Sequence, residues 1–171
     1  MNKEEILKAN AILDAREERV NLIETLIENY KNTIVVARVN YPGNNKENYI
    51  SDYIIEKGRE ELIKVFNDRI EHIIEKSSAE GPYIVLTLKL DGNTAKRRTI
   101  EIENTHLLGR FLDLDVYEGN ISSISRQSLG FDKRTCYLCG NYAHECIRSK
   151  NHTVEEVEEF IIKAVKRYME K

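Results

Sequence analysis

The sequence lacks the features that mark several classes of protein. It has no apolar run long enough for a signal peptide or a membrane-spanning helix. With 26 basic and 29 acidic residues the net charge is −3, so the chain has no overall positive charge of the kind that binds nucleic acid. It contains no internal repeat and no low-complexity tract. These absences predict a cytoplasmic protein that binds neither membranes nor nucleic acid.

Cysteine is also scarce. The three cysteines all fall between residues 136 and 146, and a cytosolic protein rarely forms structural disulfides. The cluster therefore needs another explanation. The length of 171 residues, with 41% hydrophobic and 32% charged residues, suits a single domain over residues 1–171 with a real core.

The apolar spacing predicts an α+β fold. Long helices are expected over 3–30, where an apolar stripe runs from Ile6 through Leu13 to Tyr30, over 47–76, and from Thr153, which begins a capping box with Glu156. Strands are expected over 33–39, 83–90, 95–103 and 109–116, with a hairpin turn at Asp91-Gly92. Together these elements predict a mixed, mostly antiparallel sheet with helices packed on it.

The stretch 109–116 carries two aspartates within an apolar run. Asp113 and Asp115 point to the same face of a strand, because side chains alternate along it. Two ionised carboxylates on a buried face need a compensating charge, and Mg²⁺ or Mn²⁺ suits carboxylate oxygens. The alternative is an edge strand whose aspartates face water.

Four residues near this strand are further candidates. Arg110 precedes it and is placed to hold a phosphate. Glu103 would supply a third carboxylate if its strand were the neighbour, or would lie on a polar outer face. His106 is a candidate base, phosphate donor or structural residue. Gly109 would let the backbone approach a ligand closely.

Basic residues elsewhere suggest anion binding. Arg16 interrupts the apolar stripe of the first helix, so it contacts a ligand, pairs with a nearby acid or reaches solvent. Lys46 ends the Pro42-Gly43 turn within reach of a phosphate, although a lone loop lysine is usually just solvated. Arg126 lies in a loop, 121–135, that carries a local basic patch.

The segment 136–152 has the spacing of a metal site. Cys136 and Cys139 form a Cys-x-x-Cys knuckle, and Cys146 with His152 or His144 would complete a tetrahedral set. We favour His152, because His144 is too close to Cys146 in the chain. Three thiolates and one imidazole would form a structural zinc site. The alternative is three reduced cysteines without a metal.

Four blocks of the chain resemble the apo-citrate lyase phosphoribosyl-dephospho-CoA transferase family, also called citrate lyase holo-acyl-carrier-protein synthase. The blocks are 14–19, with Arg16 and Arg19; 40–46, ending at Lys46; 103–116; and the stretch from Ser125 through the cysteine cluster to His152. They appear in the family's order and span nearly the whole chain. One departure is Leu107, where proline is expected; it relaxes only the approach to the strand.

The resemblance implies a reaction. Such enzymes transfer the prosthetic group of 2′-(5″-triphosphoribosyl)-3′-dephospho-CoA to a serine of the citrate lyase acyl carrier subunit and release pyrophosphate. Asp113 and Asp115 would hold divalent ions, with Glu103 as a less certain third ligand. One carboxylate, or His106, would take the serine proton. The remaining roles fall to basic residues: Arg110, Lys46 and Arg126 would clamp the triphosphate, and Arg16 and Arg19 would meet that group or the acidic carrier protein.

Paired carboxylates on one strand also resemble DNA polymerase beta-type nucleotidyltransferases, which suggests a similar sheet by analogy. Two hypotheses compete with the transferase. In the first, the chain is a non-catalytic zinc-binding module that binds RNA or a protein partner. In the second, it is a structural subunit of the lyase complex that binds the carrier without turnover. Loss of activity in variants of the paired aspartates would favour the transferase. Loss of binding only in variants of the cysteine cluster would favour the binding module.

Overall fold

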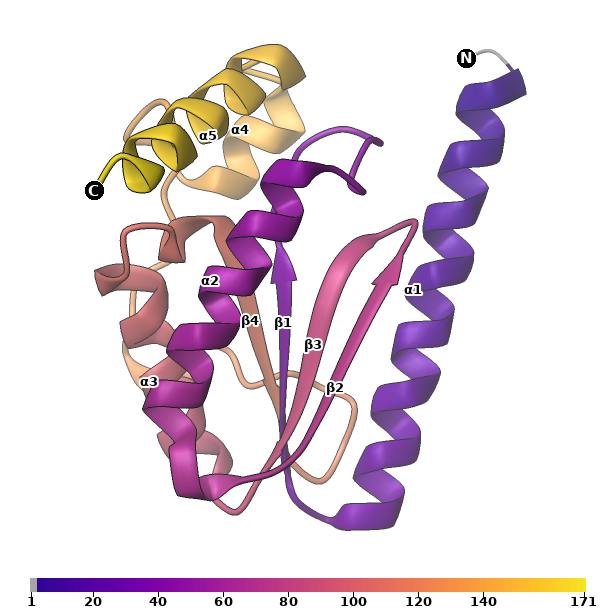
Figure 1. Ribbon diagram of the computed structural model, residues 1–171, viewed down its shortest axis with the longest axis vertical. Helices are drawn as coiled ribbons and strands as arrows, with labels where there is room; N and C mark the ends of the chain where they lie inside the picture. Colours follow the sequence, from indigo (N-terminus) through magenta and orange to yellow (C-terminus); the bar gives the residue numbers. More distant parts are fainter. Residues whose placement is uncertain (1–2) are drawn as a thin grey trace.

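The computed structural model describes residues 3–171 and confirms an α+β fold (Figure 1). Its helices are α1 (Lys3–Tyr30), α2 (Tyr49–Phe66), α3 (Gly92–Thr105), α4 (Ala143–Ser149) and α5 (Val154–Met169). Its strands are β1 (Thr33–Val39), β2 (Ile70–Ser78), β3 (Gly81–Leu88) and β4 (Leu112–Tyr117). The sheet order is β2-β3-β1-β4, and all three pairings are antiparallel. Among the described helices, none combines the length and apolar character that a membrane span needs.

The two faces of the sheet pack against different helices. α2, α3 and α5 form the larger core with residues such as Leu112, Leu114 and Val116 of β4. On the other face, Ile23 and Leu26 of α1 pack against the sheet. β1 is buried on both faces, as its β-branched run predicts. Asp113 and Asp115 alternate with the apolar residues of β4, so they point to the α1 face.

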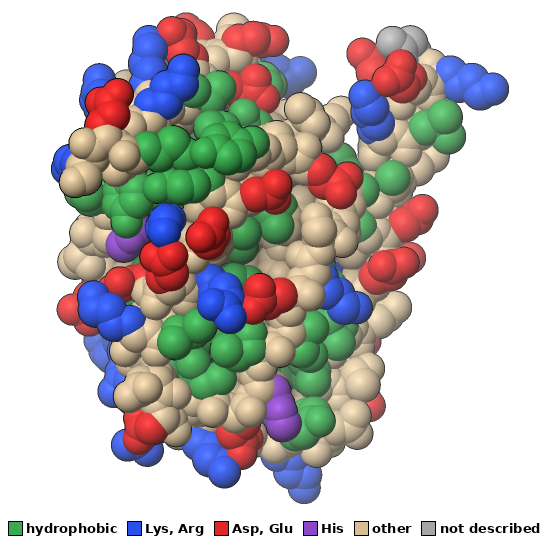
Figure 2. Space-filling view, in the orientation of Figure 1, with side chains coloured by type: hydrophobic (Ala, Val, Ile, Leu, Met, Phe, Trp, Pro, Cys, Tyr) green, Lys and Arg blue, Asp and Glu red, His purple; other side chains and the backbone are tan. Residues whose placement is uncertain are grey.

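The first half of α1 extends beyond the sheet. The predicted helix over 3–30 is confirmed, but Ile6 and Leu13 of its apolar stripe are exposed, and burial begins at Ala15. Figure 2 shows this end of α1 standing clear of the main body. The periodic pattern therefore predicts the helix correctly, but it predicts that more of the helix is buried against the sheet than the structure shows.

The predicted helix over 47–76 is wrong in its last third. α2 ends at Phe66, and Asn67 adopts a φ of 34°, which stops the helix. Residues Ile70–Ser78 instead form β2, which pairs along the free edge of β3. The isoleucines of this segment fit either a helix or a strand, and the hairpin with β3 decides between them.

The predicted strand over 95–103 is also wrong, because this segment lies in α3. Asp91 does not form a hairpin turn; its side chain accepts a hydrogen bond from the Thr94 backbone N–H at 2.9 Å and caps the helix. Ala95, Thr99 and Ile102 are buried at helical spacing. The hairpin turn lies between β2 and β3, at residues 79–80.

Side chains form hydrogen bonds with the backbone groups along the outer edge of β4. The Leu114 backbone N–H donates to the Glu103 carboxylate at 3.0 Å, and its carbonyl accepts from Lys96 Nζ at 2.8 Å. Arg134 donates to the Leu112 carbonyl at 2.7 Å. An open strand edge exposes unpaired backbone groups, so these contacts hold in place the strand that carries the aspartates.

Gly109 lies in close contact with the backbone of α3. A Cβ at this position would lie 2.2 Å from the Ile102 carbonyl oxygen and 3.0 Å from Glu103 Cα. We expect Gly109→Ala to lower the free energy of unfolding by about 1–3 kcal/mol, because the turn before β4 must move away from α3. Gly140→Ala is the control, since its Cβ meets nothing within 4 Å. Equal denaturant midpoints for the two variants would contradict this account.

Candidate functional site

Seven charged side chains gather where α1, β1, β4 and the β2–β3 turn meet, and we call them the charge cluster. They are Arg16, Arg19, Arg38, Lys46, Glu80, Asp113 and Asp115. Five of these residues were predicted from the sequence, in segments far apart along the chain. The fold therefore brings most of the predicted polar site together on the α1 face of the sheet.

Arg38 lies between the two aspartates. Its Nη2 contacts Oδ2 of Asp113 and Oδ2 of Asp115, the latter at 3.0 Å. The prediction that the two carboxylates share a face is confirmed, and in this structure a guanidinium compensates their charge. Sequence reasoning missed Arg38, although it is the only charged residue in the β-branched run 33–39.

Burial and neighbouring charges shift the pKa values of Asp115 and Arg38. Burial and the neighbouring charge of Asp113 raise the pKa of Asp115, because both disfavour its ionised form. Burial lowers the pKa of Arg38, but the charges of Asp113, Asp115 and Glu80 outweigh it, so the net shift is upward. The aspartate pair is thus a site that favours a cation.

Glu80, also missed from the sequence, anchors the basic residues. Arg19 donates to it through Nε at 2.7 Å and Nη2 at 3.0 Å, and Arg38 Nη1 lies at 3.2 Å. The Glu80 side chain is only 6% exposed. Burial raises its pKa, but Arg19 and Arg38 outweigh that effect and the net shift is downward. Arg19 is therefore held in a buried ion pair with Glu80.

Arg16 and Lys46 form the accessible rim of the charge cluster. Arg16 Nε lies 3.6 Å from Glu80, and its side chain is 57% exposed. Lys46 donates to the Tyr41 carbonyl at 2.6 Å, and burial lowers the pKa of its amine. Both cations retain hydrogen-bonding capacity for an incoming anion.

The structure does not bring Glu103 or His106 to the aspartates. Glu103 lies on α3 and its carboxylate is engaged by Leu114 and Arg134, so it is not on a neighbouring strand as expected. His106 Nδ1 accepts from the Leu108 N–H at 3.2 Å, and its ring lies 5.7 Å from that of Tyr168. Burial lowers the pKa of His106. Glu103 therefore supports β4, and the His106 ring packs beside α5.

Arg110 and Arg126 lie apart from the charge cluster and line a cavity of about 1000 Å³. We call it the basic cavity, because five cations line it: Arg110, Arg126, Lys133, Arg134 and Lys150. It is bordered by the end of α3, the loop after β4, α4 and the start of α5. The sequence-predicted phosphate residues thus fall into two groups.

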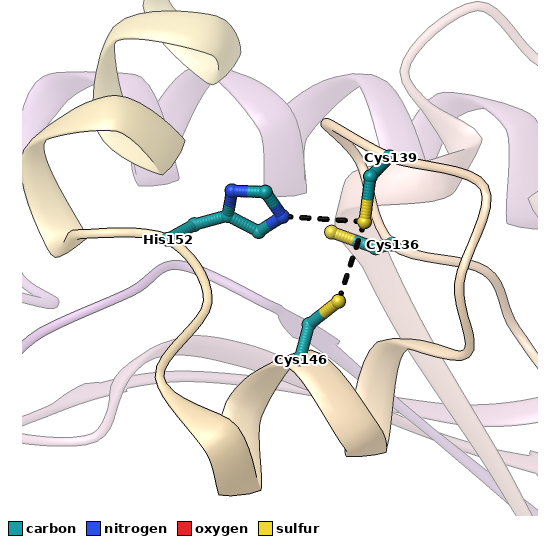
Figure 3. Close-up of side chains that lie close together, drawn as sticks. All are labelled: Cys136, Cys139, Cys146 and His152. Atoms are coloured by element: carbon teal, nitrogen blue, oxygen red, sulfur yellow. Dashed lines mark hydrogen bonds between the residues drawn. The ribbon is translucent and has the colours of Figure 1, made fainter.

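The cysteine-rich segment forms a compact Cys/His group (Figure 3). The ligand atoms of Cys136, Cys139, Cys146 and His152 lie within 4.8 Å of one another, so this group can hold a metal ion. Cys139 Sγ lies 3.4 Å from Cys146 Sγ and 3.3 Å from His152 Nε2. The four residues favoured from the sequence lie together, whereas His144 stacks on Tyr142. It is the only such group among residues 3–171.

Similar proteins identify the family. Residues 7–168 match the family described as apo-citrate lyase phosphoribosyl-dephospho-CoA transferase. A probable transferase of that name from Vibrio cholerae is 31% identical over 150 residues, which cover 84% of this chain and 83% of the relative. The transferase of that name from Citrobacter koseri is 29% identical over 149 residues, covering 85% of this chain and 81% of the relative.

A longer relative matches the same region. Protein CitXG from Haemophilus influenzae is 32% identical over 155 residues, covering 88% of this chain. The chain spans about a third of the length of that relative, since the match covers 33% of it. The family match, over residues 7–168, includes the charge cluster and the Cys/His group. The chain therefore belongs to the apo-citrate lyase phosphoribosyl-dephospho-CoA transferase family.

Proposed function

We propose that this protein transfers the phosphoribosyl-dephospho-CoA group from 2′-(5″-triphosphoribosyl)-3′-dephospho-CoA to a serine of the apo citrate lyase acyl carrier protein, in the cytoplasm. The serine oxygen forms a phosphodiester bond to the α-phosphorus, and the bond from that phosphorus to pyrophosphate breaks. Family membership supports the reaction. The charge cluster, which combines paired carboxylates with accessible cations, supports its location.

Asp113 and Asp115 are the residues we propose to hold a divalent cation. Their Oδ2 atoms converge on a single cationic nitrogen of Arg38, so the two oxygens already face one point. Carboxylate oxygens are the ligands that Mg²⁺ and Mn²⁺ prefer. Such an ion, when bound, would stabilise the negative charge on the transferred phosphoryl group and on pyrophosphate.

The protein's own residues supply binding and proton transfer. Arg16 and Lys46, at the rim of the charge cluster, bind the triphosphate oxygens. Asp113 has the more exposed carboxylate, 38% against 23% for Asp115, so it is our candidate to accept the serine proton. Arg38 keeps the two carboxylates aligned on the sheet.

We propose zinc as the metal of the Cys/His group. Three thiolates and one imidazole form a closed tetrahedral set, which is typical of structural zinc. We expect about one zinc ion per chain in the purified protein, a loss of that metal in Cys139→Ser, and a lower melting temperature for this variant. His144→Ala is the control, because its ring lies outside the group. Metal analysis that finds no zinc in the wild-type protein would contradict the proposal.

The intact mass of the acyl carrier subunit tests the function. Purified apo carrier is incubated with the protein, the triphosphoribosyl donor and Mg²⁺, and a carrier with its acceptor serine replaced by alanine is the control. We expect the wild-type carrier alone to gain the mass of the phosphoribosyl-dephospho-CoA group, with release of pyrophosphate and loss of both on chelation. Binding of the carrier without a mass gain would overturn the proposal and favour a structural subunit.

A further inference from the structure

We propose that the basic cavity binds the dephospho-CoA portion of the donor, with its diphosphate on Arg126. This inference rests on the proposed function and adds a second binding region to it, apart from the charge cluster. A cavity of about 1000 Å³ is far larger than a single phosphate needs. It lies at the upper end of the range for sites that enclose drug-sized ligands and cofactors, roughly 300–1,000 Å³.

The charges lining the cavity favour a polyanion. Glu103 and Asp132 are the only acids among its described lining residues, and Glu103 is already engaged by Arg134 and the β4 backbone. Within residues 3–171, no carboxylate pairs with the three outer cations, which are Arg110, Lys133 and Lys150. The cavity therefore carries positive charge that the folded chain leaves uncompensated, and a phosphate-bearing ligand would neutralise it.

Arg126 has unused hydrogen-bonding capacity. Its Nε is buried and has no hydrogen-bond partner among the described residues. Its Nη2 reaches Asn104 Oδ1 only at 3.5 Å and Glu103 Oε2 only at 3.9 Å. A buried donor without a partner costs free energy, so an anionic oxygen of a ligand would satisfy it. A diphosphate presents such oxygens to a guanidinium in matching geometry.

The cavity also has an apolar and aromatic side. The ring of Tyr137 stacks on Phe160 with an interplanar angle of 7°, and the Arg110 guanidinium lies 5.7 Å from the centre of the same Tyr137 ring. Ile147, which is 74% exposed, and Val154 line the wall. An aromatic base and an aliphatic chain both suit such a surface, whereas free phosphate uses none of it.

The cavity lies beside the strand that carries the aspartate pair. Arg134 lines the cavity and donates a hydrogen bond to the carbonyl of Leu112, the residue before Asp113. Lys46 and Arg16 lie instead with Glu80 on the α1 face. The donor would therefore extend from the cavity to Asp113, with its triphosphate at the charge cluster. This divides the phosphate clamp predicted from the sequence into two sites.

The Cys/His group forms part of the same wall. Cys136, Cys146 and His152 all line the cavity. A metal ion that fixes these residues would also fix the position of Lys150, which follows α4. The proposed zinc site and the proposed nucleotide site therefore share one structural element.

Calorimetric titration with 3′-dephospho-CoA itself tests the cavity without any need for turnover. We expect Arg126→Ala to raise the Kd about tenfold, as loss of a charge-assisted contact does. The double variant Lys133→Ala/Lys150→Ala should weaken binding similarly, and both lysines are exposed, so this variant folds. Lys163→Ala, which removes a surface charge on α5, should bind as the wild type does.

The outcomes separate this proposal from the proposed function. A wild-type protein that does not bind dephospho-CoA, or cavity variants that bind it within twofold of wild type, would overturn the cavity proposal even if carrier transfer is intact. Tight binding that the cavity variants weaken, together with no transfer to the carrier, would support the cavity and overturn the transferase. Weakened binding in the cavity variants with a matching rise in the donor KM supports both.

Discussion

Replacing Asp113 or Asp115 by asparagine is expected to reduce transfer to the acyl carrier by about a thousandfold, the size of effect seen when a group that stabilises transition-state charge is removed. Asparagine keeps the shape of the side chain but loses the charge that binds a divalent cation. The measurement is the initial rate of mass gain by the carrier. Asp68→Asn is the control, because Asp68 is an exposed residue in the turn after α2. Transfer within tenfold of wild type would remove the proposed metal role.

The same substitutions should leave the fold intact. The raised pKa of Asp115 means that the folded protein disfavours its ionised form, so a cost in stability develops as the pH rises above the ordinary pKa of 3.8 and is complete above the folded-state value. Asp115→Asn removes this cost, and Arg38 keeps its contacts with Asp113 and Glu80. We expect the free energy of unfolding at pH 7 to stay within about 1 kcal/mol of wild type. A collapse in stability would make the activity loss uninformative about metal binding, and Asp113→Asn then serves as the second variant.

Glu80→Ala is expected to lower the free energy of unfolding by about 3–5 kcal/mol, because it leaves Arg19 buried without a partner. Arg19 is 5% exposed, and its guanidinium donates two hydrogen bonds to Glu80. Urea denaturation measures the effect. The matched control is Glu75→Ala, which removes the partner of Arg59 in an exposed pair and should cost less than about 1 kcal/mol.

Two further measurements identify the cause of the Glu80 effect. The lowered pKa of Glu80 means that its ion pairs stabilise the fold above the ordinary pKa of 4.5 and that this contribution is lost as the pH falls through the folded-state value. The difference between wild type and Glu80→Ala should therefore narrow in acid. The double variant Arg19→Met/Glu80→Leu should recover much of the lost stability, since it removes both buried charges. A difference in the free energy of unfolding between wild type and Glu80→Ala that does not change with pH would show that the variant loses packing and not an ion pair.

Local patterns were sufficient for several parts of this protein. The alternation around Asp113 and Asp115 predicts a strand with both carboxylates on one face, and the structure confirms it. The spacing of the cysteines with His152 predicts one metal-binding group. The capping box is present, with Glu156 N–H donating to Thr153 at 3.2 Å. Each of these features depends on residues within 20 positions of one another, so neighbouring residues suffice to specify it.

Segments with mixed patterns were decided by the partners that the folded chain supplies. Residues 70–78 carry isoleucines that suit a helix, yet they complete the edge of the sheet beside β3. Residues 95–103 show some alternation, yet the Asp91 cap and the burial of Thr99 make them a helix. The backbone hydrogen bonds of a strand come from another part of the chain, and local propensity does not contain that information.

The sequence by itself determined the family, the α+β class, the aspartate strand and the cysteine cluster, since each is carried by residue type and short-range spacing. Only the tertiary structure decided which charges meet. Arg38 reaches Asp113 because β1 pairs with β4, and Arg19 reaches Glu80 across 61 positions because α1 packs beside the β2–β3 turn. It also placed Glu103 and Arg126 beside the cavity instead of beside the aspartates. A buried charge takes its partner from whatever the fold brings within a few ångströms, so separation in sequence does not predict it.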